Sequence, residues 1–131
     1  MRIHLAVLTS SILVGSCASM TTSFSEVTGE RFNLTPVDRR ALTIESVGNV
    51  NGWTNGAPVQ VEPGLHRVVV TAERHGGFRG RTVAFELNVE PCTRYYINAQ
   101  FANPITPDFV PVIDHQETIA GCVWPRPTAK T

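Results

Sequence analysis

The stretch Thr82–Glu90, with the sequence TVAFELNVE, decides the fold class of this chain. Apolar side chains occupy every second position in it, namely Val83, Phe85, Leu87 and Val89. A two-residue period places these side chains on one face of an extended strand and the others on the opposite face. Pro91 ends the strand, because proline has no amide hydrogen to donate to a sheet.

Other segments of the chain are also strand-like. They are Leu42–Glu45, Val59–Val61, Leu65–Glu73, Thr93–Ala102 and Phe109–Thr118. Pro111 lies in the last of them and favours an edge position in a sheet. No segment has a sustained helical period of apolar residues. Five to seven short strands between turns therefore predict an all-β fold, an antiparallel β-sandwich of the immunoglobulin-like or prealbumin-like kind.

Composition limits the possible functions. The chain has 131 residues, which suits one domain. Its 11 basic and 11 acidic residues give a formal charge of +0. A balanced charge argues against a nucleic-acid partner bound through phosphates. The sequence contains no phosphate-binding glycine loop before a helix and no nucleophilic serine motif. We therefore expect a protein that is not an enzyme and uses no cofactor.

The first residues predict export from the cytoplasm. Met1-Arg2 carries a positive charge, Ile3–Val14 is mostly apolar without an acidic residue, and small residues follow. This is the layout of a secretory signal peptide. The apolar run is too short to span a membrane, which takes about 20 residues in a helix. We expect residues 1–16 to be the signal peptide.

The segment Leu13-Val14-Gly15-Ser16-Cys17 resembles the bacterial lipobox, in which small residues precede a lipid-bearing cysteine. The resemblance implies cleavage before Cys17, acyl chains on that residue and a firm membrane anchor. Ala18 is not the aspartate that retains such proteins in the inner membrane. The resemblance thus implies a lipid-anchored protein of the cell envelope, at the outer membrane and facing the periplasm. The alternative is an ordinary signal peptide in which Cys17 is incidental.

The mature chain is expected to have three parts. Residues 17–31 are rich in serine and threonine and predict a lipidated cysteine followed by a flexible tether. Residues 32–123 form the predicted β-sandwich domain, with a short strand expected near Phe32. Residues 124–131 contain two prolines and predict an extended tail.

Two cysteines remain after Cys17, and they are Cys92 and Cys122. A pair in an oxidising compartment predicts a disulfide. Closing a loop of this length stabilises a fold by about 3–4 kcal/mol on chain-entropy grounds. The alternative is a pair of buried thiols without a bond between them.

Part of the chain carries a family-like motif: Asn51-Gly52, then Gly56-Ala57-Pro58, then a run over 59–70 that contains Pro63-Gly64-Leu65-His66. With these residues, the segment from Leu42 to about Val89 resembles the PEGA-type domain, a small β-sandwich of bacterial surface proteins related in shape to transthyretin-like modules. The segment Glu90–Ile97 is similar to small lipoproteins of unknown function that add a later cysteine. Asn51 and Ala57 depart from the usual pattern. The resemblance implies a fold and not an activity.

Three histidines of the mature chain are candidates for chemistry: His66, His75 and His115. If they converged, they would support a small periplasmic hydrolase or a metal-binding protein. No HxH or HExxH spacing is present, so we expect no metal site.

Two features predict a binding surface. Arg74, Arg79 and Arg81 flank a glycine-containing loop, and they would attract an anionic partner such as a polysaccharide or lipid headgroups. The alternative is a solvated loop between two strands. Trp53 lies in a turn-rich stretch, and an exposed tryptophan in a loop can anchor a partner. Its alternative role is packing against the rim of the sandwich.

These patterns together predict a non-enzymatic lipoprotein of the cell envelope, a binding or structural module at the membrane surface. Its expected partners are the membrane, through the lipid, and an envelope protein or polysaccharide. Two alternatives stay open. One is a hydrolase or metal-binding protein that uses the three histidines, and the other is an inhibitor or chaperone that uses an exposed strand edge.

Overall fold

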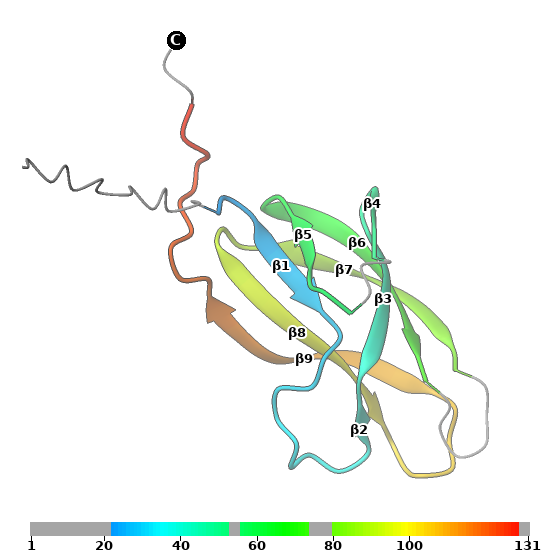
Figure 1. The fold of residues 1–131 in the computed structure, drawn as a ribbon. Helices are drawn as coiled ribbons and strands as arrows, with labels where there is room; N and C mark the ends of the chain where they lie inside the picture. The colour runs from blue at the N-terminus through cyan, green and yellow to red at the C-terminus, as the bar shows by residue number, and fades with distance from the viewer. Residues whose placement is uncertain (1–21, 53–55, 74–79, 129–131) are drawn as a thin grey trace, which may run out of the picture.

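The computed structural model describes residues 22–52, 56–73 and 80–128, and within them the chain is built from strands without a helix. These described ranges form nine strands (Figure 1). They are β1 (Ser25–Thr28), β2 (Arg39–Arg40), β3 (Leu42–Val47), β4 (Val50–Asn51), β5 (Val59–Val61), β6 (Gly64–Ala72), β7 (Thr82–Val89), β8 (Thr93–Phe101) and β9 (Phe109–Thr118). The number exceeds the five to seven expected, because β2 and β4 are two-residue segments without a readable period.

The strands form two sheets that pack face to face. Sheet I has the order β5-β1-β8-β9, and β2 pairs with the second half of β8. Sheet II has the order β4-β3-β6-β7. The predicted all-β sandwich is therefore confirmed. All the strand pairs are antiparallel except β1 with β8, which run parallel from Glu26 beside Arg94 to Thr28 beside Tyr96.

The core is the layer between the sheets, and the alternation in the sequence identifies its residues correctly. In β7 the even-numbered side chains are exposed, while Leu87 and Val89 are buried. In β8 the side chains of Tyr95, Ile97, Ala99 and Phe101 are all at most 2% exposed. They face a group of buried aliphatic side chains of sheet II: Leu42, Ile44, Val47, Val68, Val70, Leu87 and Val89.

Strand β1 lies in the segment that the sequence predicts to be a tether. Its Ser25 is fully buried, and the hydroxyl donates to the carbonyl of Glu90 at 2.5 Å and accepts from the amide of Thr93 at 3.2 Å. Val27 is also fully buried, between β8 and β5. Ordered structure thus begins well before residue 32. The short strand expected near Phe32 is absent, since the described chain makes an irregular loop there.

The sandwich has two ends with different contents (Figure 1). At the disulfide end, defined by residues 22–24, 90–92 and 119–128, the described chain starts and the tail leaves. At the loop end, defined by residues 29–38 and 102–108, two long connections project beyond the strands. The strands run from one end to the other, so residues far apart in sequence gather at each.

Strands β7 and β9 each lie at one edge of their sheet and pair with one neighbour among the described residues. The edge position predicted for the strand with Pro111 is confirmed, because β9 pairs with β8 alone. A separate finding is that the described residues contain no helix long and apolar enough to cross a membrane.

Candidate functional site

The predicted disulfide is present. The sulfurs of Cys92 and Cys122 are 2.00 Å apart and their Cα atoms 5.6 Å apart. The bond joins the turn before β8 to the segment after β9. Cys122 also forms an isolated bridge with Thr22, whose carbonyl accepts from the amide of Val123 at 2.8 Å. The disulfide therefore fixes the segment after β9 to the turn before β8, and the backbone bridge fixes the start of the described chain to the same segment.

Five of the residues singled out from the sequence lie outside the described ranges: Cys17, Trp53, Arg74, His75 and Arg79. Their roles stay predictions. Arg81 is described at the loop end, where its guanidinium lies 2.6 Å from the carboxylate of Asp108. Both side chains are more than half exposed, so this pair contributes little to stability and leaves Arg81 accessible to a partner.

The two described histidines lie in different sheets and have different neighbours. His66, in β6, has its Nε2 at 2.7 Å from the carbonyl of Glu62. His115, in β9, stacks on Phe32 with ring centroids 3.6 Å apart. Within the described part of the chain, no three His, Cys, Asp or Glu side chains are grouped so that they could hold a metal.

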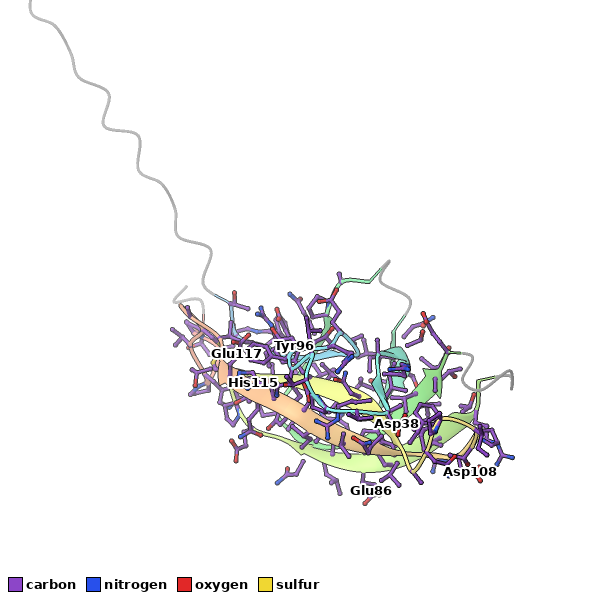
Figure 2. All side chains as sticks on the ribbon, turned by 90° about the horizontal axis from the view of Figure 1, so that it is seen from below. Asp38, Glu86, Tyr96, Asp108, His115 and Glu117 are labelled. Carbon is purple, nitrogen blue, oxygen red and sulfur yellow. A yellow bond between two sulfur atoms is a disulfide. The ribbon has the colours of Figure 1, made fainter. Side chains whose placement is uncertain are left out.

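A chain of paired charges runs along the outer face of sheet I. Arg94 of β8 lies 2.6 Å from Glu26 of β1 and 3.0 Å from Glu117 of β9, so one guanidinium links three strands. The hydroxyl of Tyr96 donates to the same Glu117 at 3.0 Å. Figure 2 shows Tyr96, His115 and Glu117 gathered on one side of the β8–β9 pair. The hydrogen bond to Glu26, foremost among the causes, raises the pKa of Arg94 above its already high ordinary value.

Asp114 of β9 holds the connection between β1 and β2 in place. One of its carboxylate oxygens accepts from the amides of Asn33 at 2.7 Å and Phe32 at 3.3 Å, and the other lies 2.6 Å from the guanidinium of Arg39. Its side chain has no exposed area. Burial acts to raise the pKa of Asp114, but the Asn33 amide, Arg39 and the Phe32 amide together hold it below its usual value.

Asn98 adds a second attachment for the same connection. Its amide nitrogen donates to the carbonyls of Gly29 at 3.2 Å and Glu30 at 2.9 Å, in the gap between β1 and β2. Gly29 is required at this point, since a Cβ there would lie 1.7 Å from the carbonyl oxygen of Leu42. The connection 29–38 is thus attached at both its start and its middle.

The firmly held connection presents apolar side chains to solvent. The three most exposed large hydrophobic side chains in the described residues are Val37 at 80%, Leu34 at 77% and Ile105 at 76%. All three lie at the loop end, two in the connection 29–38 and one in the turn between β8 and β9. We call these three residues the loop-end face.

A surface hollow of about 320 Å³ lies beside this face, lined by Gln100, Ala102, Thr106, Asp108, Phe109 and Val110. Gln100 joins the hollow to the face, because its side-chain amide donates to the carbonyl of Val37 at 3.1 Å. Val110 is 65% exposed and extends the apolar area along β9. An apolar area of this kind, on a connection held by several polar contacts, suits a partner that docks without rearranging the loop.

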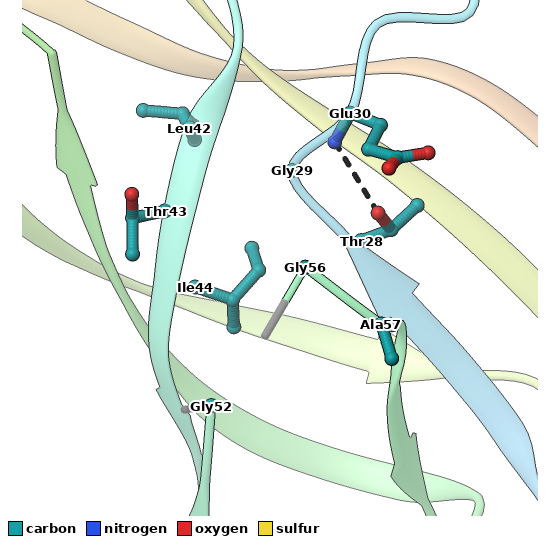
Figure 3. Close-up of a pocket in the computed structure, with 9 residues that line it drawn as sticks. All are labelled: Thr28, Gly29, Glu30, Leu42, Thr43, Ile44, Gly52, Gly56 and Ala57. Atoms are coloured by element: carbon teal, nitrogen blue, oxygen red, sulfur yellow. Dashed lines mark hydrogen bonds between the residues drawn. The ribbon is translucent and has the colours of Figure 1, made fainter. Parts of the chain in front are cut away.

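A smaller pocket of about 170 Å³ lies between the end of β1 and β3 (Figure 3). Its described lining includes Thr28, Gly29, Glu30, Leu42 and Ile44, together with two glycines of the connection after β4. Among the described residues of that lining, Glu30 is the one ionisable side chain.

Sequence reasoning missed the residues that build this region. Asp114 and Arg39 lie 75 positions apart, and no local pattern indicates that they meet. Leu34 and Val37 are two apolar residues in a stretch without a period, which predicts neither a strand nor a surface. Only the pairing of β8 with both β9 and β2 brings these elements together.

Searches of family models, of curated proteins and of solved structures find no match to this chain.

Proposed function

We propose that this protein is a lipoprotein of the cell envelope and acts as a non-enzymatic binding module. In this proposal residues 1–16 direct export, Cys17 carries the lipid, and the loop-end face binds an envelope protein or polysaccharide. The observation that carries the binding role is the gathering of Leu34, Val37 and Ile105 at one end of the sandwich. The chain enters the sandwich at the opposite end, at Thr22, so a lipid on Cys17 would leave the loop end free.

The charged residues beside the loop-end face favour a partner whose surface carries both apolar and charged groups. Arg81 and Asp108 lie at the same end as the apolar face, and both are well exposed. Polar groups around an apolar centre are the usual composition of a protein–protein interface, whose centre supplies most of the affinity. Arg74 and Arg79 belong to the connection that Arg81 follows, and their predicted role in attracting an anionic partner is part of this proposal.

The ionisable groups of the outer face favour a supporting role over a catalytic one. Glu117 already accepts from Arg94 and Tyr96, and Asp114 accepts from Arg39 and two backbone amides. A general base needs a carboxylate or imidazole free to take a proton from a substrate. These two carboxylates are instead held by cations and amides, which suits the attachment of strands and loops.

The test has two independent arms. Intact mass of the protein extracted from membranes should show cleavage before Cys17 and the added mass of acyl chains. Photo-reactive residues placed at Leu34, Val37 or Ile105 in living cells should cross-link to one envelope component. The same residue at Thr43, exposed on the outer face of β3, is the matched control and should not.

Each arm can fail separately. An uncleaved or unlipidated mass would reject the lipoprotein proposal. Equal cross-linking from Thr43 and the loop-end positions would reject the binding face. Substituting Leu34→Ser should reduce cross-linking at Ile105 while leaving the free energy of unfolding within about 0.5 kcal/mol, because the side chain is largely in solvent.

A second candidate function uses a strand edge. Strand β7 has eight residues without proline and pairs only with β6 in the described chain. Its free edge can accept an extended segment of another protein, as an inhibitor or chaperone would. Cross-linking from Ala84, exposed on β7, in the absence of cross-linking from Leu34 would favour this candidate over the first.

A further inference from the structure

We infer that the disulfide end of the sandwich rests on the lipid surface, with Val123 and Trp124 inserted among the headgroups. This inference depends on the proposed lipid at Cys17. It goes beyond an anchor, because it assigns a second, protein-borne contact with the bilayer. The contact uses side chains of the tail rather than the acyl chains.

The first step is the short distance between the proposed anchor and the folded domain. Thr22 is held by its bridge to Cys122 and by the hydrogen bond from Val123. Only five residues of chain lead from Cys17 to Thr22. A fully extended chain gains at most about 3.6 Å per residue, so Thr22 must stay within about 18 Å of the acylated residue. The headgroup layer takes up about 5–8 Å of this length.

The second step is that apolar side chains stand beside this point. Val123 is 47% exposed and Trp124 is 38% exposed, directly after the disulfide. Leu65, the second residue of β6, is 66% exposed at the same end, since the neighbouring Gly64 pairs with Val89 next to the turn that contains Cys92. Tryptophan is enriched at the membrane–water interface, because its ring is apolar while its indole N–H can bond to headgroups or water.

The third step concerns charge at this end. The guanidinium of Arg126 lies 4.6 Å from the centre of the Phe24 ring and 4.0 Å from the carboxylate of Glu62. The nearby negative charge of Glu62 offsets the attraction of Arg126 for anionic lipid. Apolar insertion rather than charge should therefore drive the contact, which makes it insensitive to salt. Two partly exposed side chains bind a bilayer weakly alone, but the anchor makes the contact intramolecular and so effective.

The test uses the mature lipidated protein in vesicles of phosphatidylethanolamine and phosphatidylglycerol. The chain has two tryptophans, so a Trp53→Phe variant leaves Trp124 as the single reporter. We expect a blue shift of its emission on reconstitution, strong quenching by lipids brominated near the top of the acyl chains, and protection from aqueous iodide. High salt should leave all three unchanged.

The matched control moves the reporter to the other end of the molecule. In the Trp53→Phe/Trp124→Phe background, Ile105→Trp places a tryptophan at the loop end, where we expect iodide quenching and no quenching by bromolipid. If Trp124 in the lipidated protein behaves like this control, the inference is overturned while the lipid anchor stands. A protein that carries no lipid by intact mass rejects the proposed function first. If Trp53→Phe fails to fold, a photo-reactive residue at Val123 must form a lipid adduct, and its absence overturns the inference.

Discussion

The two ends of this sandwich fasten irregular segments by different chemistry. At the disulfide end, the tail is held by the covalent bond between Cys92 and Cys122 and by one hydrogen bond to Thr22. At the loop end, the connection 29–38 is held by the carboxylate of Asp114 and the amide of Asn98. A covalent attachment depends on the redox state of its surroundings, whereas an ionic one depends on pH. The same fold therefore carries two attachments that respond to different conditions.

The largest effect is expected from breaking the disulfide. The variant Cys92→Ala/Cys122→Ala should lose about 3–4 kcal/mol of unfolding free energy, because the unfolded chain is no longer closed into a loop. Urea denaturation with and without reductant measures this. Reductant should lower the stability of the parent by a similar amount and leave the variant unchanged. Equal unfolding free energies of parent and variant would contradict a stabilising role of the disulfide.

The next effect is expected at the loop end, from Asp114→Asn. The amide keeps the shape but removes the charge that accepts from Arg39 and two backbone amides, so we expect a loss of about 2 kcal/mol. Amide hydrogen exchange of residues 29–38 should accelerate, while exchange at the disulfide end stays slow. The control Asp108→Asn removes an exposed pair and should cost less than about 0.5 kcal/mol. Similar losses from both variants would mean that burial of Asp114 is unimportant.

The smallest effect is the pH dependence of the stability of the connection 29–38, compared with that of the disulfide end. Folding lowers the pKa of Asp114, so its stabilising contribution is complete above the pKa of the unfolded carboxyl, about 4. It is lost as the pH falls through the lower pKa of the folded state. Hydrogen exchange near and below pH 4 should show residues 29–38 opening before the segment after Cys92 does. In Asp114→Asn this preferential opening should already be present at neutral pH and should no longer depend on acid.

The sequence predicts the fold where local patterns carry the information. Thr82–Val89 and Thr93–Phe101 alternate over many residues, and both form long strands with the expected faces. The sequence fails at Ser25–Thr28, because two of its four residues are small and polar and yet buried. The hydroxyl of Ser25 is satisfied by groups that the chain reaches much later, the carbonyl of Glu90 and the amide of Thr93. A propensity for a flexible tether is thus overridden by tertiary hydrogen bonds.

The same reason limits prediction of the candidate site. Cysteine is rare enough that two of them in one domain predict a disulfide, and this prediction is confirmed. Aspartate is common, and nothing near Asp114 distinguishes it from a solvated residue of an edge strand. Its role arises from the irregularity between Tyr96 and Ile97 in the β8–β9 register, which no single-sequence pattern reveals.

The parallel pairing of β1 with β8 also constrains the order in which the molecule can fold. Glu26 lies beside Arg94, so a central strand from the start of the chain needs a neighbour from its last third. A polypeptide that emerges with its N-terminus first cannot complete sheet I until most of its length has appeared. Contacts between such distant residues slow folding, because a large loop must close before they form. Until then β1 lacks its parallel neighbour β8, and the nascent chain depends on the hairpins of sheet II for its first structure.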